Sequence, residues 1–291
     1  MEKLQKIGKA AKNIRESFGL TINAAETDIL KKSSLDRLEK GVDVKVSTLL
    51  AWIEKFDKSF EELLYAANNY ELTGYLAILE KAEQAYGDNQ LTALKRQLSD
   101  AKWYADESKD KRDKLNYLML KNIVSAHDRA FILDTREQNQ IINYLMSISD
   151  WSSYELVLCG NTINAFDIKQ IIPLAKAVIS RSKRYHAILR NPKIIPKILV
   201  NVANALVDNQ DYVQATYFKN EAKKLLKPQD IYDRIAIIFL EGIIEFYTGN
   251  QALGKRKMEQ AINAFEESES FGLAEIYRKT HDEIIKKSES L

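Results

Sequence analysis

Residues 21–41 have the sequence TINAAETDILKKSSLDRLEKG, and they decide how the first part of the chain is interpreted. Two short patterns with helical spacing lie on either side of a polar break at residues 31–34. In the second pattern, Leu35 and Leu38 share the side that we expect to be buried. Gly41 is expected to end that helix, because glycine adopts the left-handed conformation common at helix ends. The stretch fits a helix-turn-helix DNA-binding motif and, equally, a structural helical hairpin.

The polar residues around this turn are the candidate DNA contacts. Ser34 and Arg37 share one side of the expected helix and are the candidates for reading base edges, while the nearby lysines are candidates for phosphate contacts. Arg37 has two alternatives, a phosphate contact or a bond to Glu39. The complete candidate set is Lys31, Lys32, Ser33, Ser34, Arg37 and Lys40.

Composition indicates an all-α protein of two domains. The 291 residues exceed the size of one ordinary core, and only 10 glycines and 4 prolines leave room for few tight turns. We expect a five-helix helix-turn-helix domain at residues 1–66 and a helical-repeat domain at residues 67–291. Residues 1–66 carry 12 lysines and arginines against 11 acidic residues. DNA binding by this nearly neutral segment therefore needs charge gathered on one face, or two copies acting together.

Local signals in residues 1–66 place further helices around residues 21–41. Apolar residues at helical spacing predict a helix over residues 4–18. Ser59 with Glu62 three positions later is a capping box, which predicts a helix over residues 60–67.

Residues 67–291 show longer helical patterns that pair as hairpins, and two hairpins repeat. Ala215, Ala222 and Leu226 correspond to Gly254, Ala261 and Phe265, each 39 residues later. Small residues seven positions apart allow close helix packing, which is typical of tetratricopeptide-like units. Such units stack into a solenoid with a concave surface, and the alternative is a compact helical bundle.

The sequence offers little for catalysis or for a cofactor. His127, His186 and His281 lie far apart and outside any metal or nucleophile motif, and Cys159 sits in an apolar run that predicts a buried, inert thiol. We therefore expect no enzyme activity, no catalytic residue, no metal and no cofactor. No apolar run is long enough to cross a bilayer, and the N-terminus lacks an apolar signal core, so a cytoplasmic location is expected.

Asparagines within apolar helical patterns are the candidate ligand contacts of the second domain. Asn161 and Asn164 follow an apolar run, and Asn201 and Asn204 lie three apart among aliphatic residues. An asparagine side chain carries a donor and an acceptor, so it can pair with the backbone of an extended peptide. These amides could instead bond to neighbouring turns or cap helices.

Four motifs resemble one known family. They are IGK at 7–9, RLEKG at 37–41, WSSYELVLCGN at 151–161 and TGNQALGKRKMEQAINAF at 248–265. On these residues the whole chain resembles the Rgg/MutR-type transcriptional regulators of Gram-positive bacteria, which are peptide-responsive quorum-sensing receptors. The 151–161 motif is the most specific of the four.

The resemblance implies a homodimer that binds promoter DNA and whose repeat domain binds a short signalling peptide. Asn161 and Asn201 match asparagines that hold the peptide backbone. Asn164 stands where some members have an arginine that reads an acidic group. Phe239 lies near an aromatic position of the family groove.

Two departures from the family pattern bear on DNA binding. Glu26 stands where a small alanine usually touches the next helix, so it must turn outward or loosen that contact. Ser47 stands where some members have a cysteine that links two DNA-binding domains, so that disulfide is excluded. The alternative to a peptide-controlled DNA binder is a helical-repeat interaction protein whose helix-turn-helix is vestigial.

Overall fold

The computed structural model describes residues 2–87, 91–185 and 191–289, and all regular structure in these ranges is helical. The chain divides into two compact units, residues 1–88 and 89–291. The all-α class predicted from the sequence is confirmed. The first unit extends past residue 66 and includes α5 (Gly74–Gly87). The functional division at residues 66 and 67 stays a prediction.

The first unit holds a small core between four helices, α1 (Glu2–Ser17), α2 (Lys32–Glu39), α3 (Val46–Phe56) and α4 (Phe60–Ala67). The predicted capping box at the start of α4 is present: the Glu62 amide donates to Ser59 Oγ at 3.1 Å, and the Ser59 amide donates to Glu62 Oε2 at 2.7 Å. The core consists of Ala10, Ala11, Ala25, Leu30, Leu35, Leu38, Ala51, Trp52, Phe56 and Leu63.

Residues 21–30 differ from the prediction, because they form successive turns rather than the first helix of the motif. The Oγ1 of Thr21 accepts from the Ala24 amide at 3.2 Å, and that of Thr27 accepts from the Leu30 amide at 2.9 Å. Such side-chain bonds compete with helical hydrogen bonds. The expected fifth helix is therefore absent here, and residues 32–34 belong to α2 rather than to a break.

Gly41 ends α2 as predicted. Its φ is +68°, and its amide bonds to the Leu38 carbonyl while the Val42 amide bonds to the Arg37 carbonyl, both at 2.9 Å. A Cβ on Gly8 would lie 2.6 Å from the Gly41 nitrogen, closer than any side chain tolerates. The glycines of two separated motifs, at 7–9 and 37–41, therefore let α1 cross the end of α2.

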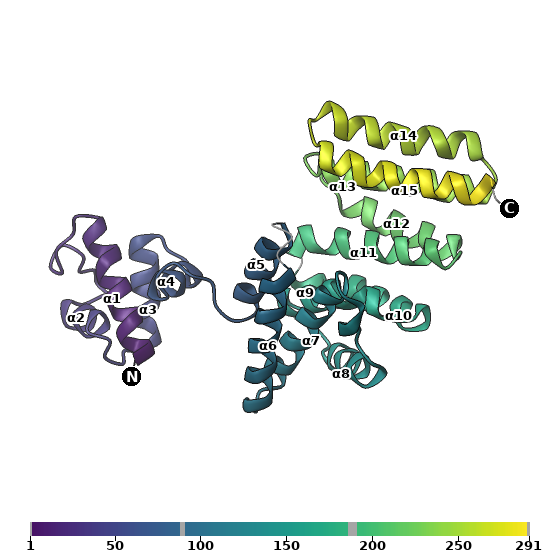
Figure 1. Ribbon diagram of the computed structural model, residues 1–291. Coiled ribbons are helices and arrows are strands. Elements are labelled where there is room, and N and C mark those ends of the chain that lie inside the picture. The colour runs from purple at the N-terminus through teal and green to yellow at the C-terminus, as the bar shows by residue number, and fades with distance from the viewer. Residues whose placement is uncertain (1, 88–90, 186–190, 290–291) are drawn as a thin grey trace. The chain divides into compact units, whose positions relative to one another are not determined.

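The second unit is a series of helical hairpins (Figure 1). Its helices are α6 (Leu91–Glu107), α7 (Lys111–Ser125), α8 (Thr135–Ser147), α9 (Ser153–Thr162), α10 (Ile168–Arg181), α11 (Asn191–Asp208), α12 (Tyr212–Leu225), α13 (Ile231–Thr248), α14 (Gln251–Glu267) and α15 (Phe271–Glu289). Short 3-10 turns occur at η1 (Arg129–Phe131), η2 (Ile163–Ala165) and η3 (Lys183–Tyr185). None of the helices described is long and apolar enough to span a membrane.

The repeated small residues pack the hairpins as the sequence predicts. Ala215 and Ala222 are fully buried where α12 packs on α11, and Ala261 is fully buried in α14. At the crossing of α13 and α14, a Cβ on Gly254 would lie 2.7 Å from the Gly242 carbonyl oxygen. Small residues thus bring paired helices close enough for the hairpins to stack.

Candidate functional site

The α2 surface carries the predicted DNA contacts. Leu35 and Leu38 point into the core, as predicted, and the opposite side of the helix is exposed. The six candidates differ in exposure: Lys31, Lys32, Ser33, Arg37 and Lys40 are exposed, and Ser34 is partly buried. Beside them lies a hollow of about 570 Å³ that is lined by Ile22, Glu26, Lys31, Lys32, Ser33 and Asp36.

Three of these cationic side chains already have partners within the protein. Lys40 pairs with Asp36 at 2.7 Å, and Lys31 lies 4.0 Å from Glu26. Arg37 donates from Nη2 to the Asp43 carbonyl oxygen at 3.0 Å. Glu26 is exposed, so it turns outward as expected from its departure from the family pattern. DNA must therefore compete with internal contacts for these groups.

Glu39 does not bond to Arg37, because it forms a buried pair with Arg15. The Arg15 Nε–Glu39 Oε1 distance is 2.6 Å and the Nη2–Oε2 distance is 2.8 Å, with both side chains at most 6% exposed. Arg15 Nη1 also donates to the Leu20 carbonyl. This two-pronged bond raises the pKa of Arg15 and fixes α2 against α1.

The asparagines of α9 and η2 are held by a residue that the sequence analysis missed. Asn122 of α7 donates from Nδ2 to the Asn161 carbonyl oxygen at 2.7 Å and to Asn164 Oδ1 at 2.8 Å. The side chain of Asn161 donates from Nδ2 to the Val157 carbonyl oxygen of its own helix at 2.8 Å. The signal for Asn122 is its place in a mainly apolar segment, residues 115–124, in which Asn116 and Lys121 are the other polar residues. The alternative role, bonding to neighbouring turns, thus holds for Asn161 and Asn164.

Asn201 and Asn204 are placed differently. Both are exposed on one side of α11, while Leu199, Val202 and Ala203 beside them are fully buried. Within the described residues neither amide has a hydrogen-bond partner, so both sets of donors and acceptors are open. This pair is the best-placed ligand surface among the predicted residues.

Phe239 lies in the core rather than on an open surface. It is 4% exposed, and its ring meets that of Tyr277 from α15 edge-on at 4.8 Å. Contact with a ligand would require α15 to move. The family resemblance that suggested Phe239 carries no information on the later helix that covers it.

The 151–161 motif forms a corner, the bend in the chain between the end of α8 and the start of α9. Trp151 is fully buried and donates from Nε1 to the Leu145 carbonyl at 3.0 Å. The Ser152 amide and hydroxyl both donate to Glu155 Oε2, at 3.0 and 2.8 Å. At the far end, a Cβ on Gly160 would lie 3.0 Å from Ile198 of α11. The motif therefore brings α9 against the helix that carries Asn201 and Asn204.

Two tyrosines complete this corner. Tyr144 donates to Glu155 Oε1 at 2.7 Å, and Tyr154 donates to Asn116 Oδ1 at 3.1 Å. Burial alone would raise the pKa of the Glu155 carboxyl, but the bonds from Tyr144 and Ser152 outweigh it and lower that pKa. Burial and the bond to Glu155 raise the pKa of Tyr144 to about 12.

Comparison with known proteins identifies the family. The profile described as HTH-type transcriptional regulator Rgg, C-terminal domain, matches residues 99–279, more than half of the chain. This chain belongs to the Rgg family of helix-turn-helix transcriptional regulators.

Solved structures share the fold of this Rgg-family chain. The SHP pheromone receptor Rgg2 of Streptococcus dysgalactiae is 21% identical, and the match covers 95% of this chain and 99% of that chain at a TM-score of 0.78. PlcR of Bacillus thuringiensis, in complex with the peptide PapR7 and DNA, is 15% identical, with 95% and 99% covered and a TM-score of 0.67. The PrgX/cCF10 complex is 18% identical, with 97% and 99% covered and a TM-score of 0.65.

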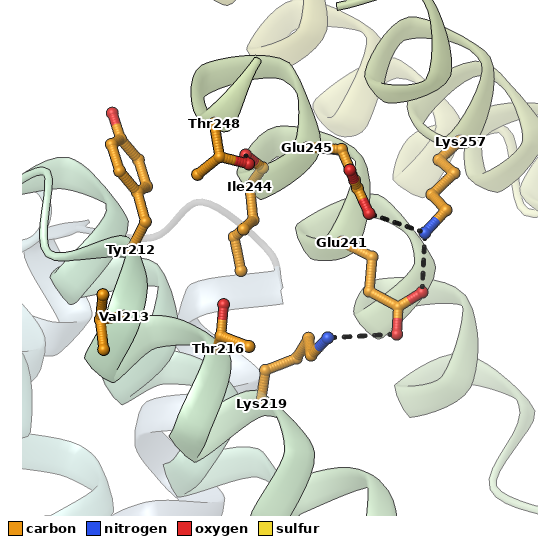
Figure 2. A pocket seen from close by; sticks show the side chains of 9 residues that line it. All are labelled: Tyr212, Val213, Thr216, Lys219, Glu241, Ile244, Glu245, Thr248 and Lys257. Atoms are coloured by element: carbon orange, nitrogen blue, oxygen red, sulfur yellow. Dashed lines mark hydrogen bonds and ion pairs between the residues drawn. The ribbon is translucent and has the colours of Figure 1, made fainter. Parts of the chain in front are cut away.

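A hollow of about 510 Å³ lies between α12, α13 and α14 of this Rgg-family chain (Figure 2). Glu241, which lines this hollow, lies 3.4 Å from Lys219, 2.9 Å from Lys223 and 3.4 Å from Lys257. Burial alone would raise the pKa of the Glu241 carboxyl, but the bond from Lys223 and the surrounding positive charges outweigh burial. The pKa of Glu241 is therefore lowered. The charged groups here satisfy one another, which is the pattern of a structural cluster.

The remaining chemical groups are Cys159, the histidines and the acidic side chains that could bind a metal ion. Burial raises the pKa of the Cys159 thiol to about 12, as expected for the inert thiol predicted. In the part of the chain that the structure describes, no three His, Cys, Asp or Glu side chains gather as metal ligands would. His186, one of the three histidines considered above, lies outside the described residues.

Proposed function

We propose that this chain is a promoter-binding transcription regulator that acts as a homodimer and is controlled by a short peptide bound beside α11. The observation that carries the proposal is the pair Asn201 and Asn204 on the exposed side of α11, where neither side-chain amide has a hydrogen-bond partner among the described residues. Unsatisfied amides on a rigid helix can bond to an extended peptide backbone without first breaking a bond in the protein.

The asparagines of α9 and η2 support the same site in another way. Asn122 ties α7 to the carbonyl of Asn161 and the side chain of Asn164, and α9 packs on α11. A surface held by such bonds keeps its shape before the ligand arrives, which lowers the entropic cost of binding. PrgX and PlcR, which share the fold, were solved with the peptides cCF10 and PapR7.

The proposed DNA contacts are Lys31, Lys32, Ser33, Ser34, Arg37 and Lys40 on the exposed side of α2. PlcR was solved with DNA, which supports this assignment by fold. Because the first 66 residues are almost neutral and their cations have internal partners, one copy should bind DNA weakly. Two copies in a homodimer would raise the affinity by binding two half-sites together.

Peptide binding is tested with a bead-bound library of random octapeptides and purified protein. We expect the protein to retain a defined subset, and Asn201→Ala/Asn204→Ala to lose about five- to 160-fold in affinity for it, because two lost amide bonds contribute about 0.5–1.5 kcal/mol each. Asn209→Ala is the matched control, since Asn209 is also exposed but bonds to the Ala205 carbonyl. Equal retention by all three proteins would exclude this peptide site.

DNA binding is tested by selection from a pool of random duplexes. We expect one enriched sequence, and uniformly weaker binding to all duplexes by Lys31→Ala/Lys32→Ala. The matched control is Lys279→Ala/Lys286→Ala, which removes two exposed charges from α15. Absence of enrichment at low salt, together with normal gene regulation after deletion of residues 2–67, would favour the alternative of a protein-interaction regulator with a vestigial helix-turn-helix.

A further inference from the structure

Helix α11 exposes one narrow stripe. Of its residues 193–208, whose side chains are described, five are exposed and the others are buried or partly buried. The five lie four, four, three and four positions apart, so they share one side of the helix. They are Lys193, Lys197, Asn201, Asn204 and Asp208.

The stripe is ordered by charge. Two lysines lie toward the N-terminus of α11, the two open asparagines lie in the middle, and Asp208 is the last residue of the helix. The helix dipole adds to this order, because the N-terminus of a helix is its positive end and the C-terminus its negative end. A ligand lying over the asparagines therefore meets a positive field on one side and a negative field on the other.

The nearby charges leave both ends of the stripe incompletely neutralised. Asp233 of α13 is the acidic group near Lys197, but no ion pair within 4 Å joins them in the described residues. Lys287 of α15 is the cation near Asp208. Partial burial raises the pKa of the Asp208 carboxyl more than Lys287 lowers it, so this carboxylate would gain from an additional cation.

The stripe has the length of a short peptide. From Lys197 to Asp208 the helix rises about 16 Å, at roughly 1.5 Å per residue. An extended chain covers that distance with about five residues, at roughly 3.3 Å each. A peptide that lies along both asparagines therefore reaches a charged residue at each end.

We propose that the stripe sets the direction and the charge of the bound peptide, with an anionic end beside Lys197 and a cationic end beside Asp208. This inference rests on the proposed peptide site. It assigns Lys197 and Asp208 as specificity-determining residues, in addition to the asparagines. The simplest ligand that satisfies both is a peptide with a free carboxyl terminus at Lys197 and a free amino terminus at Asp208.

The test uses four pools of random pentapeptides built from uncharged residues, which match the length of the stripe and differ only in their ends. The amino terminus is free or acetylated, and the carboxyl terminus is free or amidated. We expect the pool with both ends free to bind best, and each blocked end to weaken binding about two- to fivefold, the range of an exposed ion pair. Lys197→Gln should abolish the effect of amidation alone, and Asp208→Asn that of acetylation alone. Lys197→Arg should behave as the wild type.

The outcomes separate this inference from the proposed function. Binding that needs Asn201 and Asn204 but ignores both blocked ends overturns the inference and leaves the peptide site intact. Exchanged effects, with Lys197→Gln abolishing the response to acetylation, overturn the proposed direction. No asparagine-dependent binding in any pool overturns the peptide site and the inference together. Unfolding midpoints of the variants, which change only exposed residues, verify that each is folded.

Discussion

The exposed sides of α2 and α11 differ in what their polar groups already bind. On α2, Lys31, Arg37 and Lys40 contact Glu26, the Asp43 carbonyl and Asp36. On α11, Asn201 and Asn204 have no hydrogen-bond partner among the described residues. A ligand of α2 must displace contacts, whereas a ligand of α11 adds them. Affinity for DNA should therefore respond to the acids around α2, and affinity for peptide to the polar residues exposed on α11.

The largest expected effect separates structural from DNA-facing charge in the first unit. Arg15→Leu leaves Glu39 buried without its partner, which should lower the free energy of unfolding by about 3–5 kcal/mol. Arg37→Leu removes one exposed bond and should change it by less than about 0.5 kcal/mol. Denaturation of the full chain, followed by its tryptophan fluorescence, to which the buried Trp52 contributes, measures both.

The double variant Arg15→Leu/Glu39→Leu is the control for this comparison. Replacing a buried ion pair with apolar residues is often neutral, so it should recover much of the lost stability. A double variant as unstable as Arg15→Leu would mean that bonds other than the pair, such as that to the Leu20 carbonyl, hold the crossing of α1 and α2.

The next effect concerns the 151–161 corner beside α11. Glu155→Gln should destabilise the chain by about 1.5–3 kcal/mol near neutral pH, because Tyr144 and Ser152 lose a charged acceptor. The folded pKa of Glu155 lies below its usual 4.5, so the unfolded chain binds its proton more readily. This stability is present above pH 4.5 and is lost as the pH falls through the lowered pKa.

Unfolding midpoints measured from pH 3 to pH 7 check that sign. Below the lowered pKa the wild type and Glu155→Gln should converge, and above pH 4.5 the wild type should be the more stable. A constant difference across the range would mean that Glu155 acts through packing rather than through its charge.

A smaller effect distinguishes base from phosphate contacts on α2. Arg37→Ala should cost about 1–3 kcal/mol at the selected DNA site and little elsewhere, if its guanidinium leaves the Asp43 carbonyl to read a base. Lys32→Ala should weaken binding to every duplex and reduce the salt dependence. Competition titrations with selected and random duplexes give both values. A uniform loss with Arg37→Ala would assign it to a phosphate.

The smallest effect tests whether internal acids restrain the α2 surface. Glu26→Gln should raise DNA affinity about two- to fivefold, because exposed ion pairs contribute roughly 0.2–1 kcal/mol. Glu54→Gln, at an exposed position on α3, is the control for net charge. Equal gains from both substitutions would mean that only the overall charge matters.

Local signals in the sequence predicted most of the fold. The capping box of Ser59 and Glu62 begins α4, Gly41 ends α2, and the small residues at 215, 222, 254 and 261 pack the hairpins. Residues 21–30 differ from the predicted helix because the hydroxyls of Thr21 and Thr27 accept hydrogen bonds from backbone amides that would otherwise donate within a helix.

The candidate site was predicted less completely, because its details depend on contacts between distant residues. Asn122 contacts Asn161 and Asn164 across about 40 positions of sequence, and no pattern within α7 indicates that partner. Phe239 is buried by Tyr277 of a later helix. The spacing of Asn201 and Asn204, three residues apart among aliphatic residues, fits one side of a helix, but which side-chain amides lack a partner depends on the packed structure.

We infer that the same molecule binds DNA through α2 and a peptide through α11. Transcript levels test it most directly, in cells that carry the wild type, Lys31→Ala/Lys32→Ala or Asn201→Ala/Asn204→Ala. We expect both variants to change the expression of the same set of genes. Unrelated gene sets, or no change with the lysine variant, would contradict it.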